Sequence, residues 1–170
     1  MRETRNGDQM RWRTLAGTAA AVSVTAAVGG LASSTGARSD WYERLSKPAF
    51  QPPPAAFPVA WTALYADIAG VSAVVIDELE DAGEHRRAAA YRRALAANLA
   101  LNASWTWVFF RAHRLAPAVL VAGALTVSSA DLARRAGAAG RGRALALAPY
   151  VGWCAFATVL SESIRRRNRG

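Results

Sequence analysis

The sequence alternates between long uncharged stretches and short charged blocks, and this alternation limits the folds open to it. No charged residue stands between Thr14 and Ala37, and similar runs extend over residues 94–110, 115–130 and 144–161. A helix of a soluble protein normally carries a polar face, whereas these runs hold Ala, Leu, Val, Trp and Phe around most of a helix. Their lengths approach or reach the roughly 17–25 residues of a bilayer-spanning helix. The pattern therefore predicts an integral membrane protein.

Five spanning segments are predicted, all helical because a backbone in lipid must satisfy its own hydrogen bonds. The fold class is all-α, an integral membrane bundle of five transmembrane helices, and residues 1–170 form a single domain. A long first loop, residues 35–56, is expected to be an ordered lid rather than a slack tether, because it holds aromatic residues and the stiff run Pro52–Pro54. The predicted helices cover residues 15–34, 57–77, 89–110, 115–133 and 144–164.

The first apolar segment has a second interpretation, and its orientation follows from charge. A basic start and the small residues of Gly30–Ala37 also fit a cleaved signal peptide, which would leave four helices. If all five segments span, twelve basic residues lie on the N-terminal side and nine on the other. The positive-inside rule then favours a cytoplasmic N-terminus.

The chain carries a net charge of +9, a property shared by many nucleic-acid-binding proteins. Its arginines stand at the ends of the apolar runs, as at Arg111, Arg114 and residues 165–167, which is typical of lipid-headgroup anchors. The lipid membrane is thus an expected partner and nucleic acid is not. The single cysteine, Cys154, excludes an intrachain disulfide.

Helical spacing gathers aromatic and amide side chains on one face of each of three predicted helices. Residues three or four positions apart, and multiples of that spacing, share a face. The three sets are Trp61, Tyr65 and Ser72; Asn98, Asn102, Trp105 and Phe109; and Trp153, Ala157 and Leu160. Unsatisfied amides are costly in lipid, so the asparagine face should point inward. The faces either pack against one another or line a pocket for a planar, mostly apolar ligand with polar edges.

Three blocks of sequence resemble the TspO/translocator-protein family. They are WYERLSKPAFQPPPAAFPVAWTALY at residues 41–65, LNASWTWVFF at residues 101–110 and PYVGWCAFATVLSESIRRRN at residues 149–168. The blocks stand in the family's order and spacing. The resemblance implies a five-helix bundle, usually a homodimer, with a pocket beneath the first loop. It also implies porphyrin- or haem-type ligands, and it favours a pocket over packing alone.

Spacing and resemblance together define an expected site. Its ligand-binding residues are Trp41, Tyr42, Lys47, Pro53, Trp61, Tyr65, Asn98, Asn102, Trp105, Phe109, Trp153 and Ala157. The expected function is tetrapyrrole binding in transport, scavenging or stress sensing, with no required cofactor. The alternatives are a light-dependent porphyrin-degrading enzyme and a structural or regulatory membrane subunit. No catalytic residue or metal ligand is assigned, cholesterol is not expected, and the Ala/Arg-rich composition suggests a bacterial plasma membrane.

Three polar residues keep two interpretations each. Asp67 in the second predicted helix is either a functional intramembrane acid or a structural residue that pairs with an arginine or lies close to the membrane surface. Lys47 would meet either a ligand carboxylate or a lipid headgroup. His113, in the turn after residue 110, would either ligate haem iron or stay a solvated loop side chain, which is the more frequent case.

Overall fold

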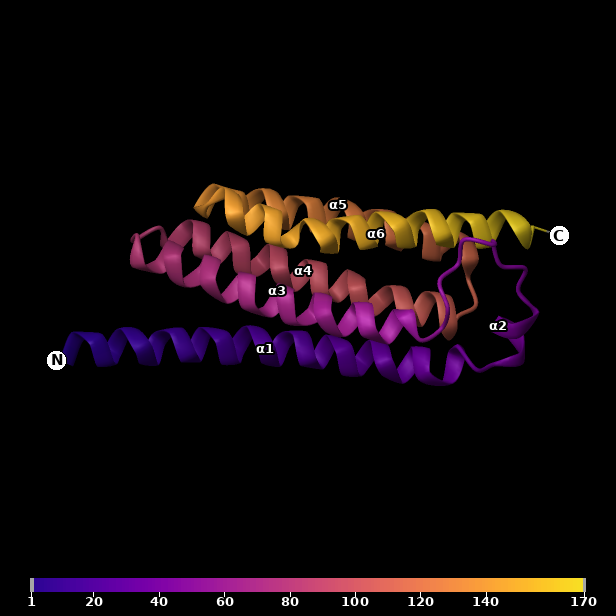
Figure 1. Ribbon diagram of the computed structural model, residues 1–170, viewed down its shortest axis with the longest axis horizontal. Helices are drawn as coiled ribbons and strands as arrows, with labels where there is room; N and C mark the ends of the chain where they lie inside the picture. The colour runs from indigo at the N-terminus through magenta and orange to yellow at the C-terminus, as the bar shows by residue number, and fades with distance from the viewer. Residues whose placement is uncertain (1, 170) are drawn as a thin grey trace.

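The computed structural model describes residues 2–169, with side chains from Arg11 to Arg169, and within them all regular structure is helical. The helices are α1 (Arg2–Gly36), α2 (Asp40–Arg44), α3 (Ala56–Asp81), α4 (His85–Phe110), α5 (Leu115–Ala139) and α6 (Arg141–Arg167). The five long helices lie in three layers, with α1 against α3 and α4, and these two against α5 and α6 (Figure 1). Residues 37–55, here named the first connection, join α1 to α3 at what we call the loop end (Figure 1). The opposite end, from which the start of α1 projects, is the amino end.

Each predicted helix lies inside an observed one, but the observed helices are longer. The apolar runs that defined the predictions stop where charges begin, whereas the helices continue to Asp81, Ala139 and Arg167. Glu, Lys and Arg favour the helical backbone about as well as Leu does, so a charged block need not end a helix. The short helix α2 was not predicted.

The outer surface of the bundle is apolar. Four helices are long and apolar enough to cross a membrane: α1 from Arg11 onward, α3, α5 and α6. Large aliphatic side chains point outward on them, since Leu31, Val59, Leu120 and Leu145 are between 67% and 74% exposed. Such apolar faces would favour aggregation in water, and lipid removes that penalty. The fold is therefore that of a helical membrane protein.

The helix α4 lacks the long, strongly apolar stretch that each of the other four long helices contains. Its first turns carry Arg86, Arg87, Arg92 and Arg93, and the two asparagines of its middle lower the hydropathy of the rest. By length and composition it does not meet the criterion that the other four long helices meet. It nevertheless has the same length as α3, 26 residues, and lies beside it throughout (Figure 1).

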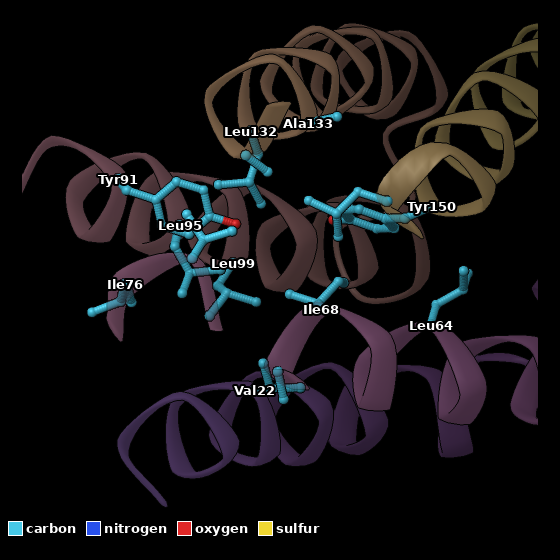
Figure 2. Close-up of a cluster of buried hydrophobic side chains, with 14 of the residues drawn as sticks. Val22, Leu64, Ile68, Ile76, Tyr91, Leu95, Leu99, Leu132, Ala133 and Tyr150 are labelled. Atoms are coloured by element: carbon cyan, nitrogen blue, oxygen red, sulfur yellow. The ribbon is translucent and has the colours of Figure 1, made fainter. Parts of the chain in front are cut away.

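The apolar core fills the space between the three layers. Figure 2 shows Ile68 and Ile76 of α3 facing Leu95 and Leu99 of α4, with Leu132 of α5 above them. Tyr150 of α6 is fully buried in this cluster, next to the helix-interior Pro149. A second cluster at the loop end is built around Phe109, Leu160 and Ile164.

Short connections set the antiparallel order of the helices. Gly83, with φ of +72°, turns the chain between α3 and α4, and left-handed backbone favours glycine. His113, with φ of +53°, does the same between α4 and α5, and the Arg114 N–H donates to the Val108 carbonyl at 3.1 Å. In the first connection Pro52 and Pro53 lie outside regular structure, and residues 54–55 then form a turn in which the Ala56 N–H donates to the Pro53 carbonyl at 2.9 Å as α3 begins.

Candidate functional site

A cavity of about 560 Å³ lies at the loop end, bounded by the five long helices and the first connection. Its wall is largely aromatic, and the aromatic lining residues are Tyr42, Phe57, Trp61, Tyr65, Trp105, Phe109, Phe110, Trp153 and Phe156. The volume falls within the roughly 300–1,000 Å³ of small-molecule pockets. The cavity is thus large enough for an organic ligand and presents aromatic rings to it together with aliphatic and small side chains.

The rings brace one another in two groups. On one side Trp61 lies 5.3 Å from Tyr65 and 6.4 Å from Trp153 between ring centroids, the latter pair meeting edge to face at 88°. On the other side Trp105 stacks on Phe109 at 5.2 Å with an interplanar angle of 17°. Edge-to-face and offset-stacked pairs are the favoured geometries of aromatic contacts, so both walls are fixed before any ligand binds.

A chain of hydrogen bonds leads from the cavity wall into the core. The Tyr65 hydroxyl donates to Asn102 Oδ1 at 2.8 Å, and Asn102 Nδ2 donates to the Tyr150 hydroxyl at 3.4 Å. The Tyr150 hydroxyl donates to Asn98 Oδ1 at 2.7 Å, and Asn98 Nδ2 reaches Ser128 Oγ at 3.2 Å. Asn98 is fully buried and Asn102 nearly so. The network ties α3, α4, α5 and α6 together and satisfies both amides in an apolar setting, as buried polar groups require.

Two polar atoms of the lining residues have no protein partner within the described part of the chain. They are the indole Nε1 of Trp105, a donor, and Oε1 of Gln51, an acceptor, and both are buried. Leaving a buried donor or acceptor unpaired costs roughly 1–3 kcal/mol. Both atoms belong to cavity-lining residues but are covered by protein atoms, so small side-chain movements would be needed to present one donor and one acceptor to a ligand.

The first connection is attached to the bundle at two points. Trp41 of α2 stacks on the His113 ring, with centroids 4.1 Å apart and planes at 16°. Further along, Asn168 holds the backbone of Ser46 with two bonds: the Ser46 N–H donates to Asn168 Oδ1 at 2.9 Å, and Asn168 Nδ2 donates to the Ser46 carbonyl at 3.0 Å. One anchor thus lies on the α4–α5 turn and the other at the end of α6.

Local bonds also order α2 itself. Ser39 is its N-cap, with its hydroxyl accepting from the Tyr42 N–H at 3.3 Å. Lys47 Nζ donates to the Tyr42 carbonyl at 2.5 Å, and its ammonium lies 4.4 Å from the centroid of the Tyr42 ring. Burial raises the pKa of the Tyr42 phenol, against a smaller lowering by the hydrogen bond from Gln51. This phenol consequently stays neutral at physiological pH.

Eight of the twelve residues expected from the sequence line the cavity. They are Tyr42, Trp61, Tyr65, Asn102, Trp105, Phe109, Trp153 and Ala157. Asn98 lies deeper, at the far end of the hydrogen-bond chain. Trp41 and Lys47 act within the first connection, and at the proline run Pro54 rather than Pro53 lines the cavity.

The other polar residues with two interpretations lie away from the cavity. Asp67 makes no ion pair within residues 11–169, and its buried Oδ2 has no partner there, so the interpretation that paired it with an arginine is not supported. His113 is exposed in its turn and uses its ring face against Trp41. Neither residue lines the cavity.

Several residues that line the cavity were not predicted from the sequence. Gln51 stands among prolines and Phe156 lies three positions after Trp153. The spacing to Trp153 is a signal for Phe156, because residues three apart share a helix face. Gln51 carries no such signal, since it lies in an irregular segment.

Comparisons with known proteins agree with this architecture. The family model described as TspO/MBR family matches residues 18–167. Protein CrtK of Rhodobacter capsulatus is 35% identical over 130 residues, which is 76% of this chain and 79% of that protein. The translocator protein of Homo sapiens is 31% identical over 134 residues, 76% of each chain. A tryptophan-rich sensory protein of Cereibacter sphaeroides is 42% identical over 82 residues, 48% of each chain.

The match covers α3 to α6, the first connection and most of α1, and so includes every element that bounds the cavity. It also contains the three sequence blocks whose aromatic residues form the cavity wall. With a helical membrane fold and a family model that spans most of its length, this chain belongs to the TspO/MBR family.

Proposed function

We propose that the chain is a membrane protein that binds a tetrapyrrole of the porphyrin or haem type in the loop-end cavity, for transport, scavenging or sensing. The observation that carries this proposal is the pairing of two braced aromatic walls with the unpaired Trp105 Nε1 and Gln51 Oε1. Flat ring surfaces favour a flat apolar ligand by stacking. The two polar atoms favour a ligand whose edge carries both hydrogen-bond acceptors and hydrogen-bond donors. A tetrapyrrole with carboxylate side chains and pyrrole nitrogens has these properties.

The first connection acts as the lid of the cavity in this proposal. Tyr42, Gln51 and Pro54 of that segment are lining residues, so a ligand of this size would touch it. Anchors to the bundle at Trp41 and Ser46 hold the lid in place without any covalent bond. Ligand exchange would therefore require these contacts to open, as in other proteins with lids.

The helix α4 serves as a fifth span in the same proposal. Its asparagines lower its hydropathy, but both are hydrogen-bonded inside the bundle rather than facing lipid. Intramembrane polar groups are tolerated when they face the interior and find partners. The charged first turns of α4 would then lie at the membrane surface.

The test is a titration of the purified, detergent-solubilised protein with protoporphyrin IX, followed by the porphyrin absorption band. Trp153→Ala removes a cavity wall, and we expect its Kd to rise about 10- to 100-fold, the equivalent of one large buried side chain. Trp12→Ala is the matched control, because Trp12 is 70% exposed and lies outside the cavity. Equal affinities in the two variants, or uptake that never saturates, would refute the pocket.

A further inference from the structure

A second cavity lies at the amino end of the bundle, on the side away from the first connection. It is an open groove of about 720 Å³ between α1 and the α3–α4 pair, and it shares no lining residue with the loop-end cavity. Its floor consists of the buried Ile76, Leu95 and Leu99, which Figure 2 shows close together on α3 and α4 above α1. An occupant of the groove would thus rest on aliphatic side chains.

Small residues leave the space for this groove. Gly17 and Ala21 line it from α1, and Ala96 lines it from α4. A Cβ at Gly17 would meet nothing within 4 Å. Nearby, the Thr18 hydroxyl donates to the Ala69 carbonyl of α3 at 3.0 Å, and this bond fixes α1 against α3. The groove therefore lies next to a direct contact between α1 and α3, and it is not a gap that a closer approach of α1 would fill.

Basic side chains stand at the mouth of the groove. Arg13 is exposed and makes no ion pair or hydrogen bond with the described residues. Arg92 donates through Nη1 to Glu80 Oε1 at 2.6 Å, and its other N–H groups make no bond to Glu80. Arg11 meets Asp81 only at 3.9 Å with both side chains largely exposed. An anion at this mouth would find two guanidinium groups within one groove.

The position of the charges along α1 matches the depth of a lipid leaflet. Arg13 is the last charge before the uncharged run that begins at Thr14, so it marks the membrane surface. From Arg13 to Ala21 the helix rises about 12 Å, at 1.5 Å per residue. One leaflet of the hydrocarbon core is roughly 15 Å deep. The groove therefore starts at headgroup level and descends through most of one leaflet.

We propose that this groove is a binding site for an anionic phospholipid of the leaflet at the amino end. The phosphate pairs with Arg13 and Arg92, and one acyl chain lies against Leu95 and Leu99 over Gly17. A free phosphate would use the mouth but leave the apolar floor uncovered.

The experiment is native mass spectrometry of the full-length detergent-solubilised protein titrated with phosphatidylglycerol, with phosphatidylcholine as the zwitterionic comparison. We expect one phosphatidylglycerol to bind more tightly than any later lipid. Arg13→Gln should weaken it about fivefold, the factor expected for one basic residue at a membrane surface. Gly17→Leu should weaken it about tenfold, since it displaces about two methylene groups of the acyl chain from the floor.

The matched control is Gly152→Leu, which places the same side chain at an exposed, unobstructed glycine of α6 outside both cavities. It should leave the first lipid unchanged. Phosphatidylglycerol binding that is equal in Gly17→Leu and Gly152→Leu would overturn the site. Equal affinity for phosphatidylcholine, or displacement of the lipid by millimolar inorganic phosphate alone, would overturn the lipid assignment. A change in oligomeric state in Gly17→Leu without a change in lipid binding would assign the groove to a second copy instead.

Discussion

Individual residues carry the chemistry of the loop-end cavity, and helical spacing placed seven of the eight predicted residues that line it on shared helix faces, while the resemblance favoured a pocket over packing. Trp61, Tyr65 and Asn102 share faces that point to the cavity, because a helix repeats its directions every three to four residues. Lys47 could not be placed in this way, since it belongs to an irregular segment. Its ammonium serves the carbonyl end of α2 rather than the cavity. Gln51 was missed for the same reason: only the fold of the first connection brings it to the cavity.

The unpaired indole nitrogen of Trp105 gives a prediction at this scale. Trp105→Phe keeps a ring against Phe109 but removes the donor. If a ligand acceptor pairs with that donor, the Kd for protoporphyrin IX should rise about three- to tenfold, the factor for one hydrogen bond. The measurement is the same absorption titration.

Trp107→Phe is the control for that substitution. Its Nε1 donates to the Val28 carbonyl of α1 at 3.1 Å, so the variant also loses an indole donor, but outside the cavity. Its affinity should equal that of the unmodified protein. An unchanged Kd in Trp105→Phe would mean that the ligand makes no bond to the indole.

At the level of elements, apolar runs predicted where helices exist but not where they end. The runs report contact with lipid, whereas a helix end depends on capping and on the backbone of the next residues. Glu78 and Glu80 extend α3 past the apolar run, and Gly83 reverses the chain. The helix α2 was overlooked because five residues are too few for a periodic pattern, although Ser39 before Asp40 is an N-cap signal.

The contact between α6 and the first connection should control ligand exchange. Asn168→Ala removes both bonds to the Ser46 backbone. Because these bonds are exposed, each contributes near the low end of the usual range, about 0.5 kcal/mol, and we expect the loss of both to raise the porphyrin dissociation rate about fivefold. Stopped-flow displacement measures this rate, and circular dichroism should show unchanged helix content.

Ser104→Ala is a suitable comparison, since its hydroxyl bonds only to the Ala100 carbonyl of its own helix and it lies outside the cavity. Its dissociation rate should stay at the original value. If Asn168→Ala behaves like Ser104→Ala, the bonds to Ser46 do not limit exchange.

For the whole molecule, the layered packing of the described helices leaves the loop-end cavity and the amino-end groove toward opposite ends of the bundle. The number of long helices followed from the sequence, because each apolar run is bounded by charges. The amino-end groove did not, since it depends on α1 lying against both α3 and α4. Residues as distant as Arg13 and Arg92 become neighbours only through that packing, and no local pattern records it.

Five spans and four spans predict different locations for the chain ends. If α4 crosses the membrane, the amino end of α1 and the carboxyl end of α6 lie on opposite sides, as they lie at opposite ends of the bundle (Figure 1). Epitope tags at the two ends of the chain should then differ in protease sensitivity in sealed vesicles. A tag inserted at Gly83 should behave like the N-terminal tag, and matching sensitivity of both terminal tags would exclude five spans.

The bond between Ser46 and Asn168 joins residues that are 122 positions apart. This anchor of the lid can therefore form only near the end of synthesis. At roughly 5–20 residues per second, a ribosome needs about 6 to 24 s to proceed from the first partner to the second. The first connection leaves the ribosome early, its Trp41–His113 contact can form once the α4–α5 turn is made, and its bonds to Asn168 form only when the last helix arrives. A small molecule present in the membrane during that interval would enter the cavity before its lid is fully attached. Synthesis of the last helix would then close the cavity around it.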